Sequence, residues 1–445
     1  MKRFAHFSTY LFVGAVAVLA TQAPHLLAQS PTDSARIDRL ERQLDVVTQE
    51  LERLNLGAGV VLGAGGVEAA SPRFGLAPAA SKVYRAQEGV SIGGYGEFLY
   101  DHYSGSRENG SPSGKIDQLD ALRGIVYVGY KFNDRLLFNS ETEVEHASSG
   151  QAGEVSLEFA YVDYRIREDF GVRAGLLLVP MGLVNEMHEP PIFLGTGRSL
   201  TESRIIPSTW RESGIGVFGE SDKWSYRAYV LNSFDGVGGG SSKAKGFSDE
   251  GLRGGRQKGS KALAEDMGLV GRVDYRGVAG LMLGGSLYYG NTGQGRELNG
   301  VVVDARAQIW EAHGRYLAHG WEGQALVAGA TLDQAEQLNT LKGLSGDDSV
   351  GDSMGGWYVQ LGYDVLWQTA TEHQLLPYFR YEALNTQESV PTGFTTNPSN
   401  DLNALSLGLA WRPIGDVVLK MDYQIHSNAA ETGVNKFSVA LGYLF

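Results

Sequence analysis

Segments that alternate apolar and polar residues fill the chain from about residue 89 to its C-terminus, and the links between them differ in length. Neighbouring side chains of a β-strand point to opposite faces, so a period of two predicts strands with one apolar and one polar face. The short links lie near residues 132–135, 167–170, 220–223, 276–280, 318–322, 368–372 and 412–416. The long, polar links lie near residues 104–117, 147–153, 181–213, 232–264, 291–302, 335–353, 385–401 and 428–435.

Short and long links alternate, and seven short links with eight long ones require sixteen antiparallel strands. Outer-membrane barrels have this asymmetry, with short periplasmic turns and long extracellular loops. A closed sheet also pairs every backbone group without an edge, as hydrocarbon demands. We therefore predict an all-β fold, a 16-stranded antiparallel transmembrane β-barrel over residues 89–445. A soluble sandwich or propeller also alternates, but it needs neither the asymmetry nor aromatic strand ends.

Two details of the barrel follow from the same pattern. The alternation slips in residues 154–167 and 303–318, which predicts either bulges or misplaced strand ends there. Aromatic residues near strand ends are expected to form the girdles at the two membrane interfaces. The expected girdle residues are Trp357, Tyr358, Trp367, Tyr378, Trp411, Tyr423 and Tyr443.

Three segments precede the expected barrel. Residues 1–28 have the basic start and short apolar run of a secretory signal peptide, too short to span a bilayer. Residues 33–54 carry apolar side chains at heptad spacing, which predicts a periplasmic coiled-coil segment. An amphipathic helix packed on its own chain is the alternative. Residues 55–88, rich in Gly and Ala, are expected to be a flexible linker. The heptad positions expected to join copies of the chain are Ile37, Leu40, Leu44, Val47, Leu51 and Leu54.

Composition excludes several classes of function. The chain has 51 acidic and 38 basic residues, a net charge of −13, and no basic tract for nucleic acid. Because it has no cysteine, it has no disulfide and no thiolate nucleophile or metal ligand. His188 and Glu189 begin like a metalloprotease helix, but Pro190 and Pro191 forbid that helix. We therefore expect that the protein is not an enzyme and has neither a cofactor nor a metal site.

A sixteen-stranded barrel is wide enough for an aqueous channel, so the polar strand faces are expected to line it. The candidate pore-wall residues are Arg123, Arg135, Glu141, Glu143, Glu145, Arg173, Arg227, Arg272, Arg380 and Lys420. The long link 181–213 is too apolar for a free surface loop and is expected to fold inward and narrow the channel. The candidate constriction residues are Glu186, His188, Glu189, Arg198, Glu202, Arg204, Arg211 and Glu212. For wall and constriction alike, ion pairs that only fix the structure are the competing interpretation.

The runs RAGLLLVPMG at residues 173–182 and IIPSTWRESGIGVFGE at residues 205–220 resemble the phosphate-selective porins of the O/P type, as does the opening strand at residues 93–97. The resemblance implies a homotrimer of barrels, each constricted by its third loop, in the outer membrane of a Gram-negative cell with the coiled coil in the periplasm. Because Glu141, Glu143 and Glu145 stand where a cationic wall would be expected, phosphate selectivity is not carried over.

Two functions follow as hypotheses. The first is a porin through which small hydrophilic, in part anionic, solutes diffuse, with outer-membrane lipid and lipopolysaccharide around it. The anion preference rests on Arg198, Arg204 and Arg211. The second is a plugged barrel that serves as a structural, adhesion or receptor protein.

Overall fold

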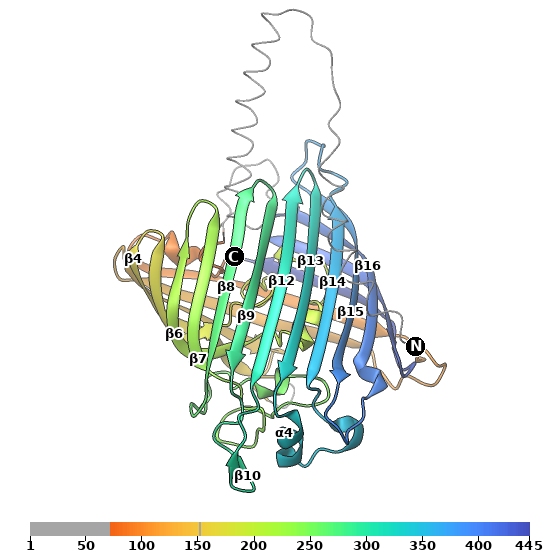
Figure 1. The fold of residues 1–445 in the computed structure, drawn as a ribbon. Helices are drawn as coiled ribbons and strands as arrows, with labels where there is room; N and C mark the ends of the chain where they lie inside the picture. Colours follow the sequence, from red (N-terminus) through yellow and green to blue (C-terminus); the bar gives the residue numbers. More distant parts are fainter. Residues whose placement is uncertain (1–71, 151–152) are drawn as a thin grey trace, which may run out of the picture. The chain divides into compact units, whose positions relative to one another are not determined.

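The computed structural model describes residues 72–150 and 153–445. Sixteen antiparallel strands close into one barrel, in which each strand pairs with its neighbours along the chain and β1 pairs with β18. Figure 1 shows the strands running side by side, with α4 and β10 at the end that carries the long connections. The 16-stranded antiparallel barrel predicted from the alternating pattern is therefore confirmed.

The strands of the barrel have the following bounds: β1 Gly89–Tyr103, β2 Gln118–Lys131, β3 Leu136–Glu145, β4 Val155–Arg167, β5 Phe170–Leu178, β6 Arg211–Glu220, β7 Trp224–Asn232, β8 Met267–Val278, β9 Leu281–Gly290, β12 Ala307–Ala318, β13 Trp321–Leu332, β14 Ser353–Tyr363, β15 Gln374–Ser389, β16 Asp401–Ile414, β17 Val417–Asn428 and β18 Lys436–Leu444. The remaining elements are the short strands β10 Glu297–Leu298 and β11 Val301–Val302, the helices α3 Leu200–Arg204 and α4 Ala335–Lys342, and the 3₁₀ turns η2 Lys82–Tyr84, η3 Pro190–Ile192, η4 Arg253–Gly255, η5 Gly346–Asp348 and η6 Pro398–Asn400. No helix in the described ranges is long and apolar enough to cross a membrane.

The outer face of the barrel is apolar along most strands. On β17, for example, Met421, Tyr423 and Ile425 are exposed, while Asp422 and Gln424 between them are buried. Such a continuous exposed apolar surface is unfavourable in water and suits the hydrocarbon of a bilayer.

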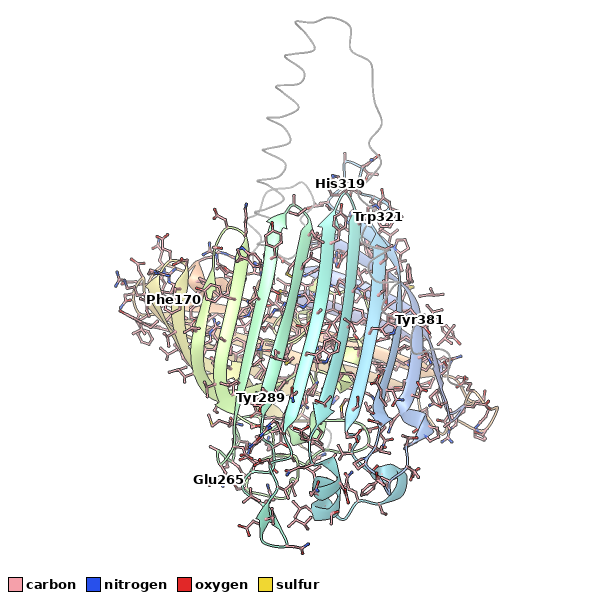
Figure 2. The ribbon with its side chains drawn as sticks, viewed as in Figure 1. Phe170, Glu265, Tyr289, His319, Trp321 and Tyr381 are labelled. Carbon is pink, nitrogen blue, oxygen red and sulfur yellow. The ribbon has the colours of Figure 1, made fainter. Side chains whose placement is uncertain are left out.

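Aromatic side chains lie on this outer face near both ends of the strands. Figure 2 shows Trp321 at the end with the short turns and Tyr289 toward the end with the long loops, and both are exposed. The girdle expectation is wrong for Tyr358 and Tyr378, which are buried on the inner face. Their hydroxyls donate inside the barrel, to Glu202 at 2.7 Å and to Asp422 at 2.6 Å.

The two predicted slips of the alternation have different causes. In β4, Glu141 pairs with Phe159 and Thr142 with Leu157, so Glu158 is a bulge residue. The bulge turns the Glu158 side chain to the inner face, where it is buried. The slip at residues 303–318 is a misplaced strand end, because β12 begins only at Ala307 and pairs regularly on both sides.

Two further links, one short and one long, have bounds that differ from the expected ones for reasons of local structure. The turn between β14 and β15 spans residues 364–373 rather than 368–372, because the Asp364 carboxylate accepts hydrogen bonds from the backbone N–H groups of Leu366 and Leu375 and closes a wider turn. The link between β9 and β12 extends to residue 306 because it contains the β10–β11 hairpin.

Candidate functional site: a charged barrel interior filled by two segments

The connection from β5 to β6, residues 179–210, folds into the barrel, and we call it the inner loop. Its apolar side chains are buried, and Trp210 has 0% of its surface exposed. Trp210 stacks on Phe234 with ring centroids 4.3 Å apart and meets Tyr288 at 4.9 Å. Burial of these side chains is the physical reason why the loop does not stay in water.

One amide side chain ties the two ends of the inner loop together. Asn185 Oδ1 accepts a hydrogen bond from the backbone N–H of Trp210 at 2.6 Å. Asn185 Nδ2 donates to the carbonyl oxygens of Val179 at 2.6 Å and Trp210 at 2.9 Å. The loop therefore leaves and re-enters the wall at one fixed place.

Cations from distant wall strands hold the far part of the inner loop. Arg315 on β12 donates to Ile192 O at 3.1 Å, Lys420 on β17 to Gly195 O at 2.9 Å, and Arg380 on β15 to Gly197 O at 3.0 Å. Hydrogen bonds from charged donors are stronger than neutral ones. These contacts from across the barrel place the loop inside the lumen.

The middle of the inner loop faces a buried ion-pair network on β7, β8 and β12. Arg227 contacts Glu186 of the loop at 3.1 Å and Asp274 at 2.8 Å, and Arg272 contacts Asp274 at 3.0 Å. His313 lies between two carboxylates, 3.0 Å from Asp274 and 2.8 Å from Glu311. Because both signs are paired at short range, this side of the lumen presents little free charge.

The part of the wall formed by β2 to β4 carries several buried carboxylates. His188 of the inner loop lies 3.2 Å from Glu141. Arg211 is 2.6 Å from Glu158, and Arg123 is 3.2 Å from Glu97 and 3.8 Å from Glu143.

Arg198 of the inner loop faces the same region, where Arg123, Tyr95, Glu97 and Glu143 act on its charge. Its Nη2 atom is buried without a hydrogen-bond partner in the described residues. Among the three arginines expected to attract anions, Arg211 is paired with Glu158 and Arg204 lies 3.6 Å from Glu250. Arg198 is therefore the cation of the inner loop whose charge is least neutralised.

Several titratable groups of the inner loop, outside the membrane-spanning strands, have shifted pKa values, among them Glu189 and His188. Burial raises the pKa of the Glu189 carboxyl to about 7, although its hydrogen bonds from the Ala79 and Ala80 N–H groups oppose the shift; His188 and Glu141 also act on it. Burial lowers the pKa of His188 to about 4, and Arg198 acts in the same direction. Both shifts favour uncharged groups in a site with little water.

A second segment, residues 72–88, also lies inside the barrel, and we call it the lumen segment. Phe74, Leu76, Val83 and Tyr84 are all buried. This differs from the expected linker, which over these residues is packed against the wall rather than free. Burial of these apolar side chains is the physical reason for the packing.

Most candidate site residues lie inside the barrel. Those buried on its inner face or in the inner loop are Glu141, Glu143, Arg173, Glu186, His188, Glu189, Glu202, Arg211, Glu212, Arg227, Arg272, Arg380 and Lys420. Arg123, Glu145, Arg198 and Arg204 are partly exposed.

The expectation for Arg135 is wrong, because this residue lies in the exposed turn between β2 and β3. The inward tyrosines and the partners Asp163 and Glu311 were missed, although the inward parity of their strands was a usable signal. The heptad positions Ile37 to Leu54 lie outside the described residues.

Comparison with known proteins gives one relative in sequence and several in structure. No family model matches the chain. An uncharacterised protein of Aquifex aeolicus is 36% identical over 366 residues, which cover 80% of each chain. The trimer form of OmpT, an outer-membrane protein of Vibrio cholerae, superposes with a TM-score of 0.50 at 13% identity, over 81% of this chain and 100% of that one. OmpF of Salmonella typhi, solved in complex with daunomycin, gives 0.50 and 13% over 80% of this chain and 97% of that one.

The structural matches are too low in identity to show more than the fold. The match to the Aquifex protein is both long and above 30% identity. The chain therefore belongs to the family of this uncharacterised Aquifex aeolicus protein and has the sixteen-stranded barrel of the outer-membrane porins.

Proposed function

We propose that the protein is an outer-membrane porin through which small hydrophilic solutes diffuse passively, with the inner loop as the constriction. The observation that carries the proposal is a closed barrel with an apolar outer face and a charged interior into which one long loop folds. A polar, charged interior allows the lumen of a barrel to fill with water, and the narrowest part of a channel sets its selectivity.

The proposal has three finer parts, which concern the preferred solute, the assembly and the surroundings of the barrel. A preference for anionic solutes rests on Arg198, whose Nη2 atom is buried without a hydrogen-bond partner in the described residues. A homotrimer is proposed because the OmpT of Vibrio cholerae is described in a trimer form. The signal peptide, the periplasmic coiled coil and contact with lipopolysaccharide stay predictions from the sequence.

Planar-bilayer recording of the purified protein tests the proposal. We expect discrete conductance steps and a reversal potential, under a salt gradient, that reports the preferred ion. Absence of any conducting step in every preparation would refute the channel. An Arg198→Gln variant should shift the reversal potential toward cations, and the exposed Arg135→Gln is the matched control.

A second candidate, a plugged barrel with a structural or receptor role, is favoured by one observation. Tyr95 of β1 and His188 are nearly fully buried, with ring centroids 6.1 Å apart, so protein atoms fill the space between the inner loop and the wall at this point. Uptake of sugars of graded size into liposomes separates the two functions, because a plugged barrel admits none of them.

A further inference from the structure

The lumen segment makes a detour that its connection to β1 does not require. β1 begins at Gly89, which pairs with Lys131 beside the short turn between β2 and β3. A chain entering β1 from that side could stay outside the barrel. Instead, residues 72–84 are mostly buried, and an antiparallel bridge between Arg73 and Leu76 reverses their direction.

The wall is shaped to accept this segment. A Cβ atom added to Gly129 on β2 would lie 2.6 Å from Val83 Cβ, so the glycine provides the space that Val83 occupies. Asn139 on β3 donates from Nδ2 to Ala80 O at 2.8 Å. Phe74 packs edge-on against Phe218 of β6, with centroids 5.0 Å apart.

A tyrosine anchors the end of the segment next to β1. Tyr84 donates its hydroxyl proton to Asp163 at 2.6 Å and accepts from Arg173 at 2.8 Å. The Asp163–Arg173 pair has its own contact at 2.8 Å, and the guanidinium also lies over the ring of Tyr161 at 4.2 Å. The wall pair therefore keeps its partners if Tyr84 leaves.

The segment also contacts the inner loop directly. The Glu189 carboxylate accepts from the N–H of Ala79 at 3.0 Å and from that of Ala80 at 3.0 Å. Ala77 packs in a small buried cluster with Met187, Ile192 and Phe193. If the segment left, the buried Glu189 carboxylate would lose the two N–H donors described here.

We propose that the inner surface of β2 to β6 is a docking surface for the lumen segment, which acts as a removable plug of the channel. Removal leaves the wall ion pair intact and opens space between the wall and the inner loop, so it widens the path. The plug rests on the proposed porin function only for its effect on permeation; its release is a property of the chain that can be measured independently.

The chain has no cysteine, which allows the plug to be locked and labelled without background. The full chain with Val83→Cys and Gly129→Cys places two thiols close together, and a shift of the segment by about 1 Å reaches disulfide geometry. Val83→Asp puts a carboxylate into the apolar contact and should release the plug. Gln87→Asp, an exposed change in the same segment, is the matched control.

In bilayers, we expect Val83→Asp to shift the main conductance step upward, the oxidised double-cysteine chain to hold it at its lowest level, and reduction to restore the wild-type level. Equal conductance of wild type, Val83→Asp and the oxidised chain would overturn the plug and leave the porin standing. Absence of conductance in every chain, Val83→Asp included, would instead refute the porin.

Labelling separates release from permeation. A single Val83→Cys chain in liposomes should react slowly with a water-soluble maleimide, and adding Glu189→Ala should increase the rate because the segment loses its acceptor. An unchanged labelling rate in the Glu189→Ala background would overturn the plug, whether or not the barrel conducts.

Discussion

Replacement of Asn185 by alanine tests how the inner loop is fixed to the wall. The change removes three buried hydrogen bonds. The carbonyl oxygens of Val179 and Trp210 keep other donors, the N–H groups of Met181 and Val179 respectively. The Trp210 N–H keeps no described acceptor.

An orphaned buried donor costs about 1–3 kcal/mol, and each of the two other lost bonds costs about 0.5–1.5 kcal/mol. We therefore expect Asn185→Ala to lower the free energy of unfolding by about 2–6 kcal/mol. Urea unfolding of the folded barrel in detergent micelles, followed by tryptophan fluorescence, measures the change. Gln368→Ala removes an exposed amide from the β14–β15 turn and is the control.

Asn185→Ala should also make the conductance steps noisier, because the loop base is looser while the barrel strands are unchanged. A variant within about 0.5 kcal/mol of wild type, the range of ordinary surface substitutions, would refute the view that this amide closes the loop.

Three further predictions concern charges. Lys420→Met removes a cation that holds the inner loop and should raise single-channel conductance; a lower or equal value would contradict this role. Glu158→Gln frees Arg211 and removes one negative charge, so the reversal potential should shift toward anions, and a shift toward cations would contradict it. Glu189 has a pKa raised to about 7 in the folded chain, so its contribution to stability is present below its unfolded value and is lost as pH rises through 7. The free energy of unfolding of the wild type minus that of Glu189→Gln should fall by about 3 kcal/mol between pH 4.5 and pH 8. His188 titrates in both chains, so its opposite effect on stability cancels in this difference. A difference that does not change with pH would refute the prediction.

The barrel was predictable because apolar and polar residues alternate with a period of two along its strands. The links 104–117 and 132–135 match the observed gaps between β1, β2 and β3 without change. Tyr358 and Tyr378 were assigned to the wrong face because an aromatic residue near a strand end suggests a girdle, although their own strand parity points inward. Parity was the stronger signal.

Packing inside the barrel was predictable only in part. The apolar side chains of the inner loop indicated burial, but the burial of the lumen segment was hidden, because its small and apolar residues read as a linker. Its recognition depends on Gly129 and on the Glu189 carboxylate, which lie far from it in the sequence. Contacts of this kind leave no periodic pattern.

A charged side chain inside the barrel can either contact solutes or hold the loop and the wall in place. The partners of each side chain in the structure separate these two roles. Arg380 and Lys420, chosen as wall residues for solutes, donate to inner-loop carbonyl groups. Arg227 and Arg272 are held by Asp274. Arg198, in contrast, faces the carboxylates of β1 and β3 with a buried nitrogen that has no partner in the described residues. Selectivity should therefore respond to substitution at Arg198 far more than at the wall arginines, whose loss should first destabilise the inner loop or the wall.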